Sequence, residues 1–312
     1  MIDKQHLRYV AAMREREKIY GIPFSTPDIQ LTRRTVDGIQ SAFSVGGPEM
    51  ENVEDVPVGD GPNINCRFYH PRRSNGEAPG VLMYLHGGGW MINSVETHDL
   101  LCRTYAGLTG LTVVAPRYSK APENPFPAAL NEITEIVSSL FRGHSALKTI
   151  PRNILLAGDS AGGNLALATA IQLRDRCRQN ATGVIVNYGV LDCDFDTPSY
   201  DRFGEGEYLL SRSAMNMFFE NYVPAGDFSN PLISPLRADL TGLPPIFISV
   251  GEVDVLQSEN IELANRAMRA NVSCDLDVYS GLMHGFIRIP HYIDRAQLAL
   301  ERQRRWINDL VS

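Results

Sequence analysis

Short apolar runs alternate with longer amphipathic stretches along most of the chain. Runs that are apolar almost throughout cover residues 80–85, 111–115, 153–157, 183–188 and 246–250, and a more alternating run covers 274–279. Strands that are apolar on both faces are typical of a parallel sheet covered by helices. The pattern therefore predicts a mostly parallel central sheet, with one further strand at 65–69.

Helical patterns fill the gaps between several of these strands, at 99–108, 128–141, 162–178 and 259–270. Strands that alternate with helices predict an α/β fold with a doubly wound sheet. The length of 312 residues fits either one large catalytic domain with an inserted lid or two ordinary domains.

Two segments stand outside this alternation. Residues 1–45 have the pattern of an amphipathic surface helix interrupted by prolines, and the long gap before residue 246 contains a predicted helix at 211–222. In that second helix, four apolar side chains share one face at helical spacing: Met215, Phe218, Phe219 and Tyr222. Such a stripe is either ordinary core or, in a lid, the ceiling of an acyl pocket.

Composition narrows the classes of protein that fit. Apolar residues make up 44% and charged residues 21% of the chain, which is typical of a globular domain and argues against disorder. The net charge of -7 contains no block of like charges, so no nucleic-acid partner is expected. We find neither a signal-peptide pattern nor an apolar run of about 18 residues, so we expect a cytoplasmic protein without a membrane span.

The five cysteines are scattered and form no C-x-x-C pair. We interpret them as reduced packing residues, which predicts neither a disulfide framework nor a metal site.

The candidate chemistry starts where the strand at 153–157 runs into Gly158-Asp-Ser160-Ala-Gly162. This G-x-S-x-G pattern, between a buried strand and an Ala/Leu-rich helix, is typical of a nucleophile elbow, in which a serine projects above the sheet on a tight turn. Gly158 and Gly162 would leave room for that turn. A glycine-rich turn without catalytic meaning is the alternative interpretation.

A serine hydroxyl needs a base before it can attack a carbonyl carbon. In elbow-containing folds the acid and then the histidine follow the serine, on loops after later strands. Asp254 and His284 meet this requirement, because they follow the strands at 246–250 and 274–279. Glu252 and Glu259 are rival acids, and a structural role is the alternative for His284.

An oxyanion hole is predicted after the strand at 80–85, where the chain reads His86-Gly-Gly-Gly89-Trp90. Consecutive glycines let backbone N–H groups face a substrate oxygen. The predicted donors are the N–H groups of Gly87, Gly88 and Ala161, and we expect the His86 side chain to brace the loop. A glycine-rich turn kept only for tightness is the alternative.

With these motifs in hand, the sequence resembles the hormone-sensitive lipase family, also called bacterial family IV esterases, over roughly residues 53–312. The resemblance rests on the segments His86–Gly89, Tyr118–Ala129, Gly158–Gly163, Ser234–Leu236 and His284–Phe286. It implies an α/β-hydrolase fold with Ser160, Asp254 and His284 as the triad. It also implies a helical cap of residues 1–45 and 190–230 over a catalytic domain of 46–189 and 231–312.

The sequence departs from the family in two places near the acid: Val255 stands where proline is usual, and Ser258 where aspartate is frequent. The resemblance also implies that Glu123 and Asp159, which match motif positions, are structural.

The hypothesis is a carboxylic ester hydrolase that acts on small esters with short- to medium-chain acyl groups, through an acyl-enzyme and without a cofactor or metal. We expect five aromatic side chains to bind substrate: Trp90, Phe203, Phe218, Phe219 and Phe286. The Asp192-Cys-Asp194-Phe-Asp196 segment is interpreted as solvated lid charge, with a polar substrate contact or a cation site as alternatives. Amide or N-formyl hydrolysis by the same triad, and a non-catalytic receptor-like module, are the rival functions. A homodimer is plausible for the family.

Overall fold

The predicted strands pair in one mixed sheet. The computed structural model describes residues 1–24, 26–59, 64–72, 80–224 and 226–312, and within these ranges eight strands run in the order β1-β2-β4-β3-β5-β6-β7-β8. Strand β2 is antiparallel to both β1 and β4, and every pairing from β4 across to β8 is parallel. The prediction of a mostly parallel α/β sheet is confirmed.

The strands are β1 (Met50–Val58), β2 (Ile64–Pro71), β3 (Val81–Leu85), β4 (Thr112–Pro116), β5 (Ile154–Asp159), β6 (Gly183–Asn187), β7 (Ile246–Val253) and β8 (Cys274–Met283). The α-helices are α1 (Lys4–Tyr20), α2 (Ile29–Gln40), α3 (Asp99–Thr109), α4 (Ala128–Arg142), α5 (Ala161–Gln172), α6 (Pro198–Phe203), α7 (Arg212–Tyr222), α8 (Gln257–Arg269) and α9 (Asp294–Val311). A π-helical turn, Leu173–Cys177, extends α5.

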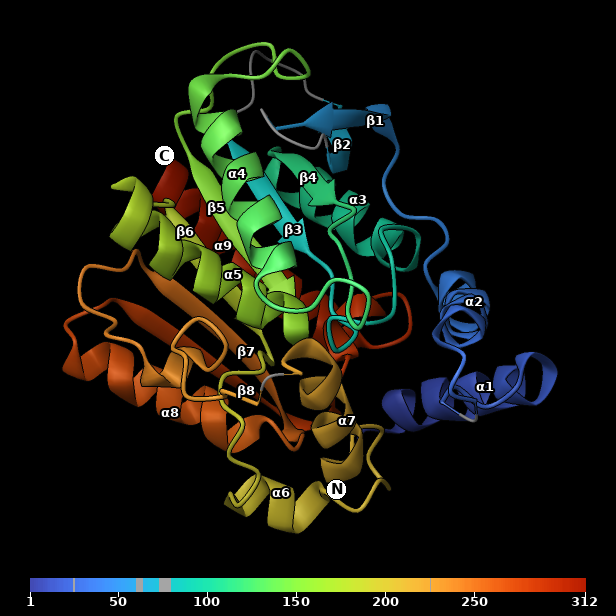
Figure 1. The fold of residues 1–312 in the computed structure, drawn as a ribbon. Helices are drawn as coiled ribbons and strands as arrows, with labels where there is room; N and C mark the ends of the chain where they lie inside the picture. Colours follow the sequence, from blue (N-terminus) through green and yellow to red (C-terminus); the bar gives the residue numbers. More distant parts are fainter. Residues whose placement is uncertain (25, 60–63, 73–79, 225) are drawn as a thin grey trace.

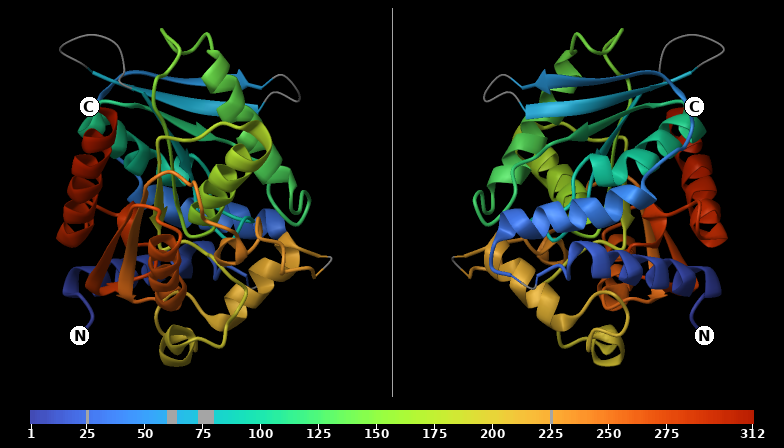
Figure 2. Two further views of the ribbon diagram at one scale, coloured as in Figure 1. Left: turned by 90° about the vertical axis from the view of Figure 1, so that its left-hand side faces the viewer. Right: turned by 90° about the vertical axis from the view of Figure 1, so that its right-hand side faces the viewer.

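Helices cover both faces of the sheet (Figure 1). Helices α3 and α9 pack against each other on one face, and α4, α5 and α8 lie on the other (Figure 2). Every residue of β3, β4, β5 and β6 is buried, because both of their faces meet helices. Helices α1, α2, α6 and α7 are the additional elements that come from the two segments outside the alternation.

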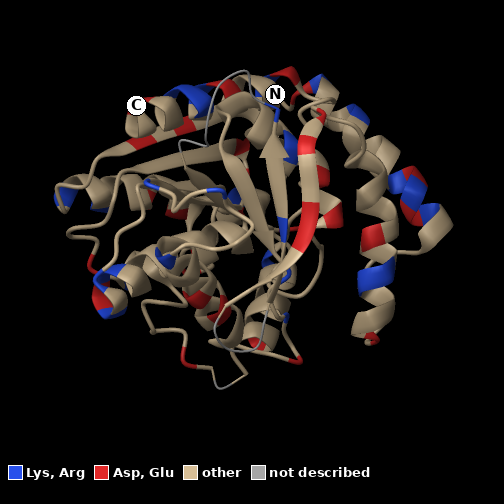
Figure 3. Ribbon diagram, turned by 90° about the horizontal axis from the view of Figure 1, so that it is seen from above, with Lys and Arg blue, Asp and Glu red and all other residues tan. Residues whose placement is uncertain are grey.

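Charged residues of both signs are interspersed along the outer helices (Figure 3). The edge strand β1 carries Glu51, Glu54 and Asp55. Asp55 pairs with Arg67 at 2.9 Å and with Arg117 at 3.3 Å. Such exposed pairs each contribute only about 0–1 kcal/mol. Charge on an edge strand discourages pairing with a second sheet, so the main effect of these residues is to protect the edge.

Gln303 of α9 lies fully buried beneath the carboxyl ends of the central strands. Its Nε2 donates to Asn187 Oδ1 at 2.7 Å and to Ser249 Oγ at 2.8 Å, and the Tyr105 hydroxyl donates to its Oε1. This network joins β6, β7, α3 and α9. The backbone of Asn187 in turn accepts the N–H of Ser160 at 2.9 Å, so the network lies directly under the elbow.

Replacing Gln303 by leucine is expected to lower the free energy of unfolding by about 2–4 kcal/mol, because buried donors and acceptors on several elements lose their partners. Urea unfolding followed by circular dichroism measures this change. Arg305→Leu, at an exposed position of the same helix, is the control and should change stability by less than about 0.5 kcal/mol. Equal stabilities of the two variants would contradict a role for the network.

Within the described ranges, we find no helix that combines the length and the apolar character that a membrane span requires.

Candidate active site

Ser160 occupies the turn between β5 and α5. Its backbone has φ 55° and ψ -122°, a region that non-glycine residues rarely adopt. The surroundings hold it there: its N–H donates to the Asn187 carbonyl at 2.9 Å, and its carbonyl accepts the N–H of Asn164 at 3.1 Å and of Val190 at 3.2 Å. Strain that neighbours maintain in this way is typical of functional turns.

Two glycines make this turn possible. A Cβ on Gly158 would lie 2.2 Å from the Gly162 carbonyl oxygen, and a Cβ on Gly162 would lie 1.9 Å from the Leu85 carbonyl oxygen. Both distances are far below van der Waals contact. The structure therefore confirms that these two positions have room for hydrogen alone.

Three side chains from distant parts of the chain meet above the sheet. Ser160, Asp254 and His284 each follow directly on the last residue of a strand, namely β5, β7 and β8. His284 Nε2 lies 3.0 Å from Ser160 Oγ, and His284 Nδ1 lies 2.9 Å from Asp254 Oδ2. Asp254 is buried, and its Oδ1 accepts the Leu256 N–H at 3.0 Å. This arrangement suits proton transfer from a hydroxyl to an imidazole held by a carboxylate.

The two rival acids have other partners. Glu252 Oε2 accepts the Ser280 hydroxyl at 2.8 Å and the Gly281 N–H at 2.7 Å. Glu259 is buried and accepts the Leu191 N–H at 2.8 Å, and burial raises its pKa well above the ordinary value. Neither carboxylate bonds to His284 in the part of the chain that the structure describes.

One of the three predicted oxyanion donors already has a protein acceptor in the glycine loop after β3. The Gly87 N–H donates to Asp159 Oδ1 at 3.0 Å, so a protein acceptor already engages it. Gly88 and Gly89 have φ values of 124° and 56°, and the Gly88 carbonyl accepts the N–H groups of Met91 and Ile92. Among the described residues, we find no protein acceptor for the N–H groups of Gly88, Gly89 or Ala161.

Asp159 anchors this loop from below. Besides Gly87, its Oδ1 accepts the Tyr84 hydroxyl at 2.9 Å and lies 3.2 Å from His98 Nε2. Burial opposes the charge, but the charge of His98 and the hydrogen bonds from His98 and Tyr84 outweigh it, so the pKa of Asp159 lies below its ordinary value. The side chain therefore stays ionised and acts as a fixed acceptor under the loop, which makes it structural.

His86 braces the same loop, as predicted. Its Nδ1 lies 2.9 Å from the Gly87 carbonyl oxygen, and its ring stacks on Tyr118 with centroids 4.4 Å apart. The Tyr118 hydroxyl donates to the His86 carbonyl at 2.7 Å. Burial lowers the pKa of His86 well below the ordinary value, so the ring is neutral. Tyr118 opens the family-specific segment 118–129, which the sequence alone left without a physical role.

The aromatic residues predicted to bind substrate lie in two groups. Phe218 lies against the glycine loop, since a Cβ on Gly89 would be 2.1 Å from its ring. Trp90 stacks on Tyr222 at 4.1 Å and contacts Phe219 edge-on at 5.2 Å. The helix stripe of α7 thus packs onto the segment that follows the predicted oxyanion loop.

The other two predicted aromatics have different surroundings. Phe286 packs under Tyr188 at 5.3 Å, and Tyr188 in turn contacts the His284 ring edge-on at 4.8 Å. Phe203 packs against Tyr208 and beneath the Arg202 guanidinium. Tyr188 was not predicted, because a tyrosine at the end of a buried strand gives no signal in the sequence.

The acidic segment is engaged by arginines. Arg237 pairs with Asp192 at 2.9 Å, Arg212 pairs with Asp196 at 3.1 Å, and Asp194 Oδ1 accepts the Asp196 N–H. In the described ranges, no group of three or more His, Cys, Asp or Glu side chains is placed to hold a metal ion.

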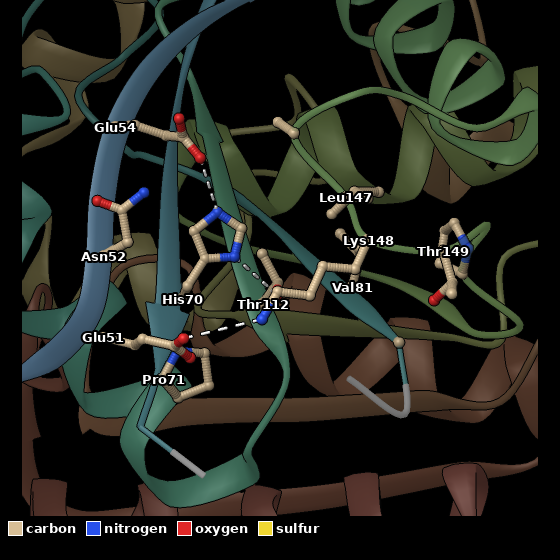
Figure 4. Close-up of a pocket in the computed structure, with 13 residues that line it drawn as sticks. Glu51, Asn52, Glu54, His70, Pro71, Val81, Thr112, Leu147, Lys148 and Thr149 are labelled. Atoms are coloured by element: carbon tan, nitrogen blue, oxygen red, sulfur yellow. Dashed lines mark hydrogen bonds and ion pairs between the residues drawn. The ribbon is translucent and has the colours of Figure 1, made fainter. Parts of the chain in front are cut away.

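A pocket also opens at the opposite end of the sheet, where β3 and β4 begin (Figure 4). Its polar groups pair with one another: Glu54 with His70 at 3.2 Å, and Glu51 with Lys148 at 3.8 Å. Because Ser160 follows the carboxyl end of β5, this pocket is not part of the site described above.

Comparison with known proteins agrees with this geometry. The sequence model of a family described as having the α/β-hydrolase fold matches residues 82–288. The ethyl acetate hydrolase of Pseudomonas putida is 30% identical over 302 residues, which is 95% of this chain and 94% of the relative. The carboxylesterase NlhH of Mycobacterium tuberculosis is 31% identical, over 90% of this chain and 82% of the relative.

Among solved structures, the hyperthermophilic esterase from the archaeon Pyrobaculum calidifontis superposes with a TM-score of 0.88 at 30% identity, and the match covers 99% of both chains. An ester hydrolase from the metagenome of Lake Arreo superposes with a TM-score of 0.89 at 28% identity, over 98% of each chain. These likenesses confirm the α/β-hydrolase fold and the esterase class that the motifs implied. The chain belongs to the α/β-hydrolase family and is a carboxylic ester hydrolase.

Proposed function

We propose that this hydrolase cleaves short- to medium-chain acyl esters through an acyl-enzyme formed on Ser160. The observation that carries the proposal is the continuous chain from Ser160 Oγ to His284 Nε2 at 3.0 Å and from His284 Nδ1 to Asp254 Oδ2 at 2.9 Å. His284 is the general base and acid, and Asp254 holds the ring in the tautomer whose Nε2 can accept a proton.

The reaction proceeds in two halves. His284 takes the Ser160 hydroxyl proton while Oγ attacks the ester carbonyl carbon, and His284 then gives that proton to the departing alkoxide as the carbon–oxygen bond breaks. In the second half His284 takes a proton from water, the resulting hydroxide attacks the acyl carbon, and the proton returns to Ser160 Oγ as the carboxylic acid leaves. The residues described supply every proton transfer in this cycle.

The tetrahedral oxyanion is stabilised by the N–H groups of Gly88, Gly89 and Ala161. This set replaces Gly87 by Gly89, because the Gly87 N–H donates to Asp159. Ala161 also lies at the start of α5, where unpaired N–H groups and the helix dipole favour negative charge. Removal of one such donor typically costs about 10²–10³-fold in rate.

Substrate size is limited by the segments that cover the site. We assign residues 1–45 and 190–230 to a helical cap over the catalytic remainder of the chain. Phe218 of α7 contacts the Gly89 backbone, and Phe24 contacts Phe218 with ring centroids 5.7 Å apart. Rings so close to the oxyanion loop leave room for short acyl groups. Relatives named ethyl acetate hydrolase and acetyl esterase support this class of substrate.

A fluorophosphonate probe tests the proposal directly. The probe is expected to label the wild-type protein at Ser160, as located by mass spectrometry of the digested adduct, and prior acylation by p-nitrophenyl acetate should slow the labelling. p-Nitrophenyl esters from acetate to decanoate should be cleaved best at the short end, and matched anilides far more slowly. Labelling at another residue would move the nucleophile away from Ser160, and no labelling at all would contradict an acyl-enzyme on this serine.

A further inference from the structure

The first residues of the chain dock against the loop that carries His284. The Asp3 N–H donates to the Gly281 carbonyl at 2.9 Å, and the Met283 N–H donates to His6 Nδ1 at 3.2 Å. Gly281 has φ 72°, and a Cβ on it would lie 2.6 Å from the Met1 carbonyl oxygen. The chain end and the histidine loop therefore touch along several consecutive residues, although they are separated by about the whole length of the sequence.

His6 is placed as a fixed acceptor in this contact. Its side chain is fully buried in the first turn of α1, where Asp3 caps the helix by accepting the N–H groups of Gln5 and His6. Because the Met283 N–H is a donor, His6 Nδ1 must carry a lone pair and the ring proton must lie on Nε2. Burial lowers the pKa of His6 to about 4, which keeps the ring in this neutral form near neutral pH.

The loop is held from its other side as well. Glu252, two residues before Asp254, accepts the Ser280 hydroxyl and the Gly281 N–H. The Arg295 guanidinium of α9 donates to the Ser280 carbonyl, and the Asp294 N–H donates to the Gln5 side chain at 3.0 Å. Strand pairing places Met283, the residue directly before His284, beside Val253. Among the side-chain hydrogen bonds of the described residues, only that of His6 reaches Met283.

We propose that His6 is a positioning residue for His284: by accepting the Met283 N–H it fixes the backbone from which the imidazole projects and so sets the 3.0 Å approach of Nε2 to Ser160 Oγ. This inference rests on the proposed role of His284 as general base. It gives the N-terminal helix a function in the chemical step, separate from covering the substrate. A displacement of about 1 Å in such a site typically costs about 10²-fold in rate.

Three substitutions in the full chain test the proposal. Asparagine places a carbonyl oxygen where His6 Nδ1 lies, glutamine places it one bond farther out, and leucine removes the acceptor. We expect His6→Leu to lower kcat for p-nitrophenyl acetate about 10- to 100-fold with KM within about threefold. His6→Asn should restore kcat to within about fivefold of wild type, and His6→Gln should lie between.

Leu7→Asn, at the neighbouring and half-exposed position of α1, is the matched control and should leave kcat unchanged. All assays are run well below the Tm of each variant, so that loss of stability does not mimic loss of rate. If His6→Leu does not fold, the ratio of kcat between the Asn and Gln variants decides the question. Equal kcat for Asn and Gln, or wild-type kcat in His6→Leu, overturns the proposal. Absence of fluorophosphonate labelling in the wild type would instead overturn the proposed function.

Discussion

Replacing Ser160 by alanine is expected to lower kcat for p-nitrophenyl acetate about 10⁴- to 10⁶-fold. The substitution removes the only hydroxyl that bonds to His284 in the described structure, at 3.0 Å from Nε2, while the N–H groups proposed to bind the oxyanion remain. Losses of about 10⁶-fold are known where nucleophile and base act as one unit, and the residual rate comes from binding and oxyanion stabilisation. Stopped-flow or steady-state release of p-nitrophenolate measures the loss.

Ser138→Ala is a suitable control, because Ser138 is also buried but lies on α4, remote from the elbow. Its hydroxyl donates to the side chain of Gln179, which lies in the segment after α5. The kcat of Ser138→Ala should stay within about twofold of wild type. Urea unfolding should show that Ser160→Ala is at least as stable as the parent, because alanine keeps the Cβ contacts of Ser160 and removes a buried polar group. A Ser160→Ala protein that turns over ester at the wild-type rate would remove this serine from the mechanism.

Replacing Asp254 by asparagine is expected to lower kcat about 10⁴-fold while leaving the fold intact. The asparagine amide can present an N–H donor where the carboxylate accepted the His284 Nδ1 proton, which favours the tautomer with its proton on Nε2. That nitrogen then faces Ser160 Oγ without a lone pair and cannot accept the hydroxyl proton. Steady-state kinetics on p-nitrophenyl acetate measures the loss, and circular dichroism verifies the fold.

Two further variants serve as controls for Asp254→Asn. Asp194→Asn removes a charge from the exposed acidic segment and should keep kcat within about twofold of wild type. Glu252→Gln tests the rival acid, whose bonds go to Ser280 and Gly281, and should lose far less activity than Asp254→Asn. The assignment of Asp254 fails if Asp254→Asn remains active and Glu252→Gln does not.

The strands that the sequence predicts most clearly are those buried on both faces of the sheet. Strands β3 to β7 are continuous apolar runs because helices cover them on two sides, and their pattern cannot be mistaken for a surface element. Strand β1 was not predicted, because an edge strand with Glu51, Glu54 and Asp55 has few buried positions. Helix α9 was also missed, since its charged face dominates the local composition and its buried residues make contacts visible only in three dimensions.

The candidate site likewise has residues that the sequence predicts and contacts that it does not. Ser160, Asp254 and His284 could be predicted because each one directly follows a recognisable strand, and strand order brings these positions to one edge. The sequence could not predict which N–H groups of the glycine loop lack a protein acceptor, because this depends on the direction in which the Asp159 side chain points. The contact between His6 and Met283 spans 277 residues, and neither residue belongs to a recognisable motif.

One consequence concerns the two tryptophans of this chain, Trp90 and Trp306. Trp306 is partly buried and packs against Phe247 of β7. Trp90 instead lies parallel to Tyr222 of α7, with ring planes 1° apart, immediately after the glycine loop. Any separation of α7 from that loop must unstack this pair and expose the indole. The protein thus carries a native fluorophore at the contact between α7 and the segment after the glycine loop. Its emission spectrum should report a separation of these two segments without an added dye.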